Sequence, residues 1–126
     1  MKFTEGYWLL SERTNGQFAS QAYHIEAMEN GLRVVAPTSP VLSRGDTLNR
    51  PTITIEFLAV SPEVISVRAW HYEGYRTGEA RFEKKETTCD AVVTITENEA
   101  VLDAGRVSVH VDRKNWGYSF WADGKL

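Results

Sequence analysis

Residues 52–72, TITIEFLAVSPEVISVRAWHY, decide the fold class of this chain. Apolar and polar side chains alternate along 52–60 and again along 64–72, a period of two that is typical of half-buried β-strands. Ser61-Pro62-Glu63 supplies the turn between the two stretches. Bulky side chains stand on both faces of the second stretch, which favours a strand covered on both sides. The whole segment therefore predicts an antiparallel hairpin.

The same period of two recurs before and after this hairpin. Further strands are expected at 22–28, 32–36, 91–96, 101–104, 106–112 and 118–122. Asn30-Gly31 and Asp123-Gly124 favour the positive φ angles of tight hairpin turns. The polar stretches are predicted to be loops or connections: 11–20, 39–51 and 73–88. With no helical period, repeat or linker in view, residues 1–126 are expected to form one all-β domain, an antiparallel β-sandwich.

The last residues suggest that this domain continues. Residues 123–126 look like a turn followed by the start of a returning strand. A strand without its neighbour exposes backbone N–H and C=O groups, which proteins normally cover. We therefore expect the chain to be an excised part of a larger protein.

Composition limits the possible partners and the compartment. A hydrophobic content of 42% and a charged content of 25% are ordinary for a folded globular domain. The formal net charge of −3, with no basic segment, argues against nucleic acid. The lone Cys89 fits a reducing cytoplasm. Residues 1–5 lack a signal-peptide core and no apolar run is long enough for a bilayer, so a cytoplasmic protein without a membrane segment is expected.

Motifs for catalysis are absent from the sequence. It contains no Gly-rich phosphate loop, no His-Glu-x-x-His, no paired-cysteine spacing and no nucleophile elbow. His24, His71 and His110 stand singly on expected strands. Seventeen acidic residues make some apparent carboxylate pair inevitable, and a solvated surface explains them. The sequence therefore predicts no catalytic residue and no metal or cofactor site.

The best local candidate for function is residues 70–76, WHYEGYR, where a strand enters a glycine-containing loop. Tyr75 and Arg76 are the candidate substrate contacts, because tyrosine offers a stacking face and arginine a planar fork of donors. The alternative is structural: Trp70 and Tyr72 pack in the core, and Tyr75 and Arg76 lie at its rim.

Several of these segments resemble one enzyme family. Residues 1–9, MKFTEGYWL, resemble the opening of bacterial α-xylosidases in glycoside hydrolase family 31. Residues 48–74 are similar to that family's paired strands, with an Arg-x-x-His-x-x-Gly pattern formed by Arg68, His71 and Gly74. Residues 105–113 and 118–126 are similar to the family's next hairpin. The resemblance covers nearly the whole chain, in the family's order and spacing.

The resemblance implies the first part of an N-terminal β-sandwich of the galactose mutarotase-like supersandwich type. In such enzymes a (β/α)₈ barrel follows and carries two catalytic aspartates for retaining hydrolysis, without metal or organic cofactor. The chain would then be a non-catalytic domain of an α-xylosidase or α-glucosidase. Its partners would be the barrel of the same parent chain and an α-linked oligosaccharide or xyloside, with the 73–83 loop bordering the sugar pocket through Tyr75 and Arg76.

Two other functions stay open. A free-standing carbohydrate-binding module would expose aromatic side chains, here Trp70, Trp116 and Trp121, on a sheet face or in a groove. A sandwich that mediates assembly into a homo-oligomer would instead cover its open edge with a second copy.

Overall fold

The computed structural model of the chain describes residues 13–48, 50–72, 74 and 89–126. The elements in these ranges are β1 (His24–Met28), β2 (Gly31–Pro37), the 3₁₀ turn η1 (Arg44–Thr47), β3 (Thr52–Ser61), β4 (Val64–Trp70), β5 (Val92–Ile95), β6 (Glu99–Asp103), β7 (Val107–Asp112) and β8 (Gly117–Ala122). The all-β expectation is confirmed, and every expected strand lies within a few residues of its predicted position. Nothing helical in the described part of the chain is long and apolar enough to span a membrane.

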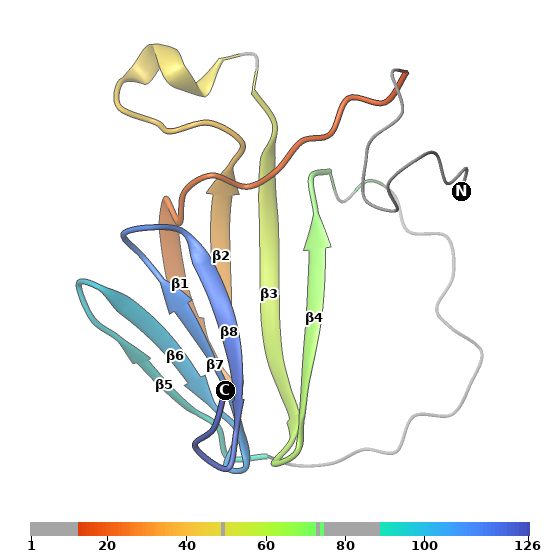
Figure 1. The fold of residues 1–126 in the computed structure, drawn as a ribbon, viewed down its shortest axis with the longest axis vertical. Coiled ribbons are helices and arrows are strands. Elements are labelled where there is room, and N and C mark those ends of the chain that lie inside the picture. Colours follow the sequence, from red (N-terminus) through yellow and green to blue (C-terminus); the bar gives the residue numbers. More distant parts are fainter. Residues whose placement is uncertain (1–12, 49, 73, 75–88) are drawn as a thin grey trace.

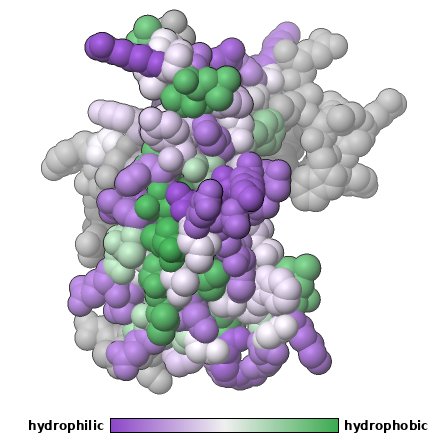
Figure 2. All heavy atoms as spheres, turned by 90° about the vertical axis from the view of Figure 1, so that its left-hand side faces the viewer, coloured by the Kyte–Doolittle hydropathy of each residue, from purple (hydrophilic) through white to green (hydrophobic). Residues whose placement is uncertain are grey.

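The strands form two antiparallel sheets, each of which follows chain order. The first sheet runs β1-β2-β3-β4 and the second β5-β6-β7-β8. In Figure 1 the second sheet lies across β1 and β2, while β4 lies at the opposite edge of the first sheet. Figure 2 views the side where β1 and β5 form the edges and shows a strip of apolar side chains between polar ones. The antiparallel sandwich is therefore built from two local meanders.

The core lies between the sheets because alternate side chains of each strand point inward. Phe57 of β3 occupies its centre, with its ring edge-on to that of Tyr118 on β8 at a centroid distance of 5.2 Å. The largest fully buried side chains are Phe57, Leu32, Leu102, Val34, Val109 and Val111. Burial of one such side chain contributes about 1.5–3 kcal/mol, so this cluster is the main source of stability.

Of the two predicted glycine-containing turns, the structure confirms one and shifts the other. The Asp123-Gly124 turn is confirmed, with φ angles of 50° and 74° and a bridge from Ala122 to Lys125. The prediction for Asn30-Gly31 was wrong in register, because the turn is at residues 29–30 and Gly31 already pairs with Met28. A Cβ at Gly31 would lie 2.5 Å from the Phe57 carbonyl oxygen. Glycine is needed there for the close approach of β2 to β3.

The expectation that 64–72 is covered on both faces was also wrong. β4 pairs only with β3 and is an edge strand among the described elements. Val67 shares the inner face with Phe57, its partner in the ladder, yet 42% of it is exposed. β2 and β3 hold the buried inner residues of this sheet, whereas no residue of β4 is buried. The bulk of a strand's side chains does not show whether another layer covers them.

A polar clasp joins the two sheets at one end. The Pro62 carbonyl, in the β3–β4 turn, accepts hydrogen bonds from the backbone N–H groups of Arg106 and Val107 at 2.9 and 3.1 Å. The Arg106 guanidinium forms ion pairs with Glu63 in the β3–β4 turn and with Asp123 in the turn after β8. These contacts fix the end of the sandwich at which the β3–β4 and β6–β7 turns meet.

Candidate functional site

The predicted contact residues can be placed only in part. Tyr75 and Arg76 lie outside the described residues. Tyr72 follows the end of β4 and is 81% exposed, so the alternative that packs it in the core was wrong. Trp70 is half-buried on the outer face of the first sheet, with the Arg68 guanidinium 5.0 Å from its ring centroid. The strand ends earlier than the alternation suggested, which leaves Tyr72 in the solvent.

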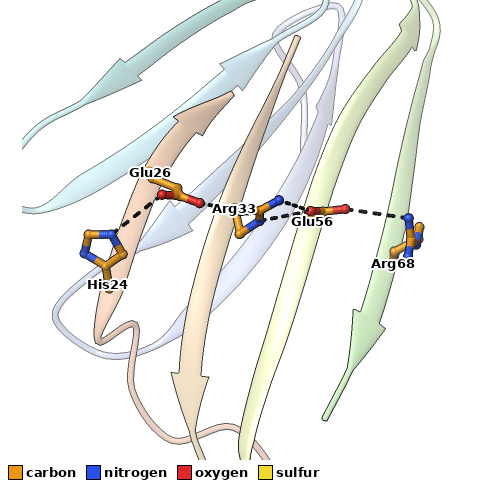
Figure 3. Close-up of polar contacts among 5 residues, drawn as sticks. All are labelled: His24, Glu26, Arg33, Glu56 and Arg68. Carbon is orange, nitrogen blue, oxygen red and sulfur yellow. Dashed lines mark hydrogen bonds and ion pairs between the residues drawn. The ribbon is translucent and has the colours of Figure 1, made fainter. Parts of the chain in front are cut away.

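A row of four charged residues crosses the outer face of the first sheet. Its members stand opposite one another in the ladder: Glu26 on β1, Arg33 on β2, Glu56 on β3 and Arg68 on β4. Figure 3 shows the alternation of acidic and basic side chains, with His24 at the β1 end. The register of the three strand pairs thus brings together residues far apart in the sequence.

Glu56 is the buried member of this row, with 7% of its side chain exposed. Its Oε1 accepts hydrogen bonds from Arg33 Nε at 2.9 Å and Nη2 at 2.7 Å. Arg33 Nη1 donates to Glu26 Oε1 at 2.7 Å. These bonds, first to Glu56 and then to Glu26, raise the pKa of Arg33. A buried carboxylate requires such partners, and the row serves the sheet structurally.

A hollow lies on the same outer face at the end of the first sheet. It has a volume of about 130 Å³ and is lined by residues of β2 and β3, by Tyr23 before β1, and by residues of the connection between β2 and β3. Figure 1 shows the path of this connection at the end of the sheet. Its lining residues are Tyr23, Val35, Pro37, Val41, Asp46, Thr47, Arg50 and Thr52. Sequence reasoning missed this site because the stretch 39–51 appeared to be a plain polar connection.

Two features hold the wall of the hollow in place. Asp46 Oδ2, in η1, accepts hydrogen bonds from the backbone N–H groups of Leu42 at 3.0 Å and Ser43 at 2.6 Å. These bonds, with that from Ser43 the largest cause, lower the pKa of Asp46. At the base of the connection, the Thr38 backbone N–H and Oγ1 both donate to the Pro51 carbonyl at 3.1 Å. The connection is therefore tied at its ends and at its turn.

The second sheet carries a serine, a histidine and a carboxylate in line on its outer face. Ser108 Oγ lies 3.1 Å from His110 Nε2, and His110 Nδ1 lies 2.8 Å from Glu99 Oε1. A hydrolytic triad also needs a sharp turn at the nucleophile and free N–H donors for an oxyanion. Ser108 instead lies inside β7, paired with Asp103 on one side and Trp121 on the other. The arrangement is a surface polar contact within a regular ladder.

The three tryptophans named for a carbohydrate-binding platform are all half-buried. Trp116 packs against the core and, at 6.3 Å between ring centroids, against Tyr118. Trp121 lies beside His110 and donates its Nε1–H to Ser119 Oγ at 2.9 Å. Trp70 lies beneath the Arg68 guanidinium. The three tryptophans therefore do not form an exposed stacking surface, which counts against a carbohydrate-binding module that uses them.

Metal binding has no visible site in the described ranges, where no group of three or more His, Cys, Asp or Glu side chains could hold an ion. Cys89 is buried, and its thiol donates to the Ala104 carbonyl at 3.3 Å.

Comparison with known proteins supplies the remaining evidence. No protein-family model matches the chain. The chain is 34% identical, over 131 aligned positions, to the alpha-xylosidase XylQ of Lactiplantibacillus pentosus. The alignment takes in 100% of this chain but 16% of XylQ, so the chain spans about a sixth of that relative's length. Along its whole length the chain is therefore related to one segment of a glycosidase.

Proposed function

We propose that this chain is the N-terminal β-sandwich domain of a family 31 α-glycosidase, an α-xylosidase or α-glucosidase, and that it supports the catalytic barrel without taking part in bond cleavage. The observation that carries the proposal is the 34% identity to an alpha-xylosidase along the entire chain. The two-sheet architecture agrees with it, because a sandwich of this kind is the fold that the resemblance to family 31 implies.

The exposed inner face of the sandwich supports a role as a docking domain. Val67 on β4 and Tyr118 and Phe120 on β8 belong to the inner faces of their sheets, yet each is more than two-fifths exposed. Exposed apolar side chains on an inner sheet face favour a place where further protein packs. In the proposed function, the rest of the parent enzyme covers it.

A chimaera tests the domain role directly. The segment of XylQ that aligns with this chain is replaced by residues 1–126, and hydrolysis of an aryl α-xyloside is compared with that of intact XylQ and of XylQ lacking the segment. We expect the chimaera to be soluble and active and the deletion to be inactive. An active deletion, or a folded chimaera without activity, contradicts the proposal.

The chain by itself is expected to leave an aryl α-xyloside uncleaved, because the proposal assigns the catalytic aspartates to the barrel. Turnover by purified chain that persists through repeated chromatography and is lost on denaturation contradicts the non-catalytic role.

The proposal also assigns Tyr75 and Arg76 to the border of the sugar pocket. In the active chimaera, the double variant Tyr75→Ala and Arg76→Ala should raise KM for the xyloside while kcat changes little, since these side chains would bind the substrate without touching the reacting atoms. Tyr72→Ala is the matched control for loss of an exposed tyrosine. Equal KM values for the chimaera, the double variant and the Tyr72→Ala variant would show that Tyr75 and Arg76 do not border the sugar pocket.

A further inference from the structure

The hollow at the end of the first sheet has the size for one small ring. Its volume of about 130 Å³ is well below the roughly 300–1,000 Å³ typical of pockets for drug-sized ligands. It lies on the outer face of the first sheet, and none of Trp70, Trp116 and Trp121 lines it. The hollow is therefore a separate feature of the domain, distinct from the tryptophans named for a binding platform.

Its floor and one wall are apolar. Val35 and Pro37 of β2 stand on the outer face next to Val41 of the connection. Tyr23, which is 56% exposed, forms the wall before β1, and its backbone N–H donates to the Val35 carbonyl at 3.0 Å. An aromatic ring beside aliphatic carbon is suited to the C–H face of a saturated ring.

The rim combines donors and acceptors. Arg50 offers only donors, the ionised Asp46 only acceptors, and the hydroxyls of Thr47 and Thr52 both. A free phosphate or carboxylate would gain from Arg50 but would be repelled by Asp46, whose pKa is lowered by the Ser43 and Leu42 N–H groups. A neutral ligand with several hydroxyl groups satisfies both charges at once.

A more open and larger depression, with a volume of about 420 Å³, continues from the hollow. It shares Tyr23, Val41 and Thr47 with the hollow and adds residues 42–44. Tyr23 thus stands between two neighbouring spaces, the arrangement expected for two adjacent units of a linear ligand.

We propose that this hollow, lined by Tyr23, Arg50 and Asp46, is a non-catalytic binding site for one pyranose ring of an oligosaccharide, with the next ring in the adjoining depression. The choice of a sugar over another neutral polyol rests on the proposed function. The site would hold a substrate chain at the domain surface while hydrolysis takes place in the barrel.

Titration of the ¹⁵N-labelled 126-residue chain with D-xylose, methyl α-xyloside and a xylo-oligosaccharide tests the site by amide chemical shifts. We expect saturable shifts at Thr47, Arg50 and Thr52, with millimolar affinity and tighter binding of the oligosaccharide. Tyr23→Ala should weaken binding about tenfold through the lost stacking contact. Arg50→Lys, which keeps the charge but loses the planar fork, should also weaken it.

Tyr72→Ala is the control and should leave binding unchanged, because Tyr72 does not line the hollow. Since both tyrosines are exposed, the fold of each variant should persist, which the spectra themselves report. The proposal is overturned if no sugar gives saturable shifts, if shifts appear away from the hollow, or if inorganic phosphate saturates the same amides instead. This readout does not depend on the chimaera, so binding without chimaera activity, or the reverse, separates failure of the proposed function from failure of this site.

Discussion

Arg33 and Glu56 form the central contact of the outer face of the first sheet, with two guanidinium nitrogens, Nε and Nη2, donating to the same carboxylate oxygen at 2.9 and 2.7 Å. Arg68 is on the other side of Glu56, with its Nη1 3.8 Å from Oε2. The geometry explains how an acidic residue is tolerated in the middle of a buried strand, since its charge is matched by hydrogen-bond donors.

Removal of Arg33 should destabilise the domain more than removal of Glu26. Arg33→Met leaves the buried Glu56 carboxylate without its two close donors, whereas Glu26→Gln changes the more exposed acid of the row. The midpoint of urea unfolding measures both. In the double variant Arg33→Met and Glu56→Met, much of the stability lost in Arg33→Met should return, because no buried charge is left without a partner and Glu26 and Arg68 are partly exposed to solvent. A double variant that is less stable than Arg33→Met would contradict this account.

Gly31→Ala should destabilise the chain by about 1–3 kcal/mol, because the new Cβ would meet the Phe57 carbonyl at 2.5 Å and the Leu58 side chain at 2.6 Å. Gly117→Ala is the matched control, since a Cβ there meets nothing within 4 Å. It should be neutral or slightly stabilising. Thermal unfolding of the two variants provides the comparison, and equal melting temperatures would show that β2 and β3 can move apart without cost.

Phe57→Ala should cost about 3–5 kcal/mol, since it opens a cavity at the centre of the sandwich beneath Tyr118 and Phe120. Tyr72→Ala, at an exposed aromatic position, should stay within about 0.5 kcal/mol of the parent. Denaturant titration followed by tryptophan fluorescence measures both. If Phe57→Ala lowers the free energy of unfolding by no more than an ordinary surface substitution does, Phe57 is not at the centre of the core.

The free energy of unfolding of the domain should fall in a defined acidic range of pH. The pKa values of Asp46 and Asp112 are lowered chiefly by backbone N–H groups, and that of Asp123 chiefly by the Arg106 side chain. A carboxyl with a folded-state pKa below its unfolded value of 3.8 contributes full stability above pH 3.8 and loses it as pH falls through the folded pKa. Stability measured by urea titration should therefore decline below about pH 4. Asp112→Asn should flatten that decline, and an unchanged slope would exclude Asp112 as a contributor.

The candidate sites show the limit of sequence reasoning more clearly than the strands do. Tyr23, Asp46 and Arg50 are separated in the chain by stretches without a common motif. They line one hollow only because the 38–51 connection folds back and Thr38 is hydrogen-bonded to Pro51. Gly31 likewise appeared to serve a turn, and only the close approach of β3 reveals its steric role.

The amino-acid sequence alone determined the strands and the all-β class, because alternation of apolar and polar residues is a local property that any half-buried strand must show. It also determined the Asp123-Gly124 turn, where positive φ angles require a permissive pair. The tertiary structure decided which strands are edges, which carboxylate is buried and which residues meet in the hollow. These depend on sheet register and on the path of a loop, which are set by contacts between residues distant in the chain.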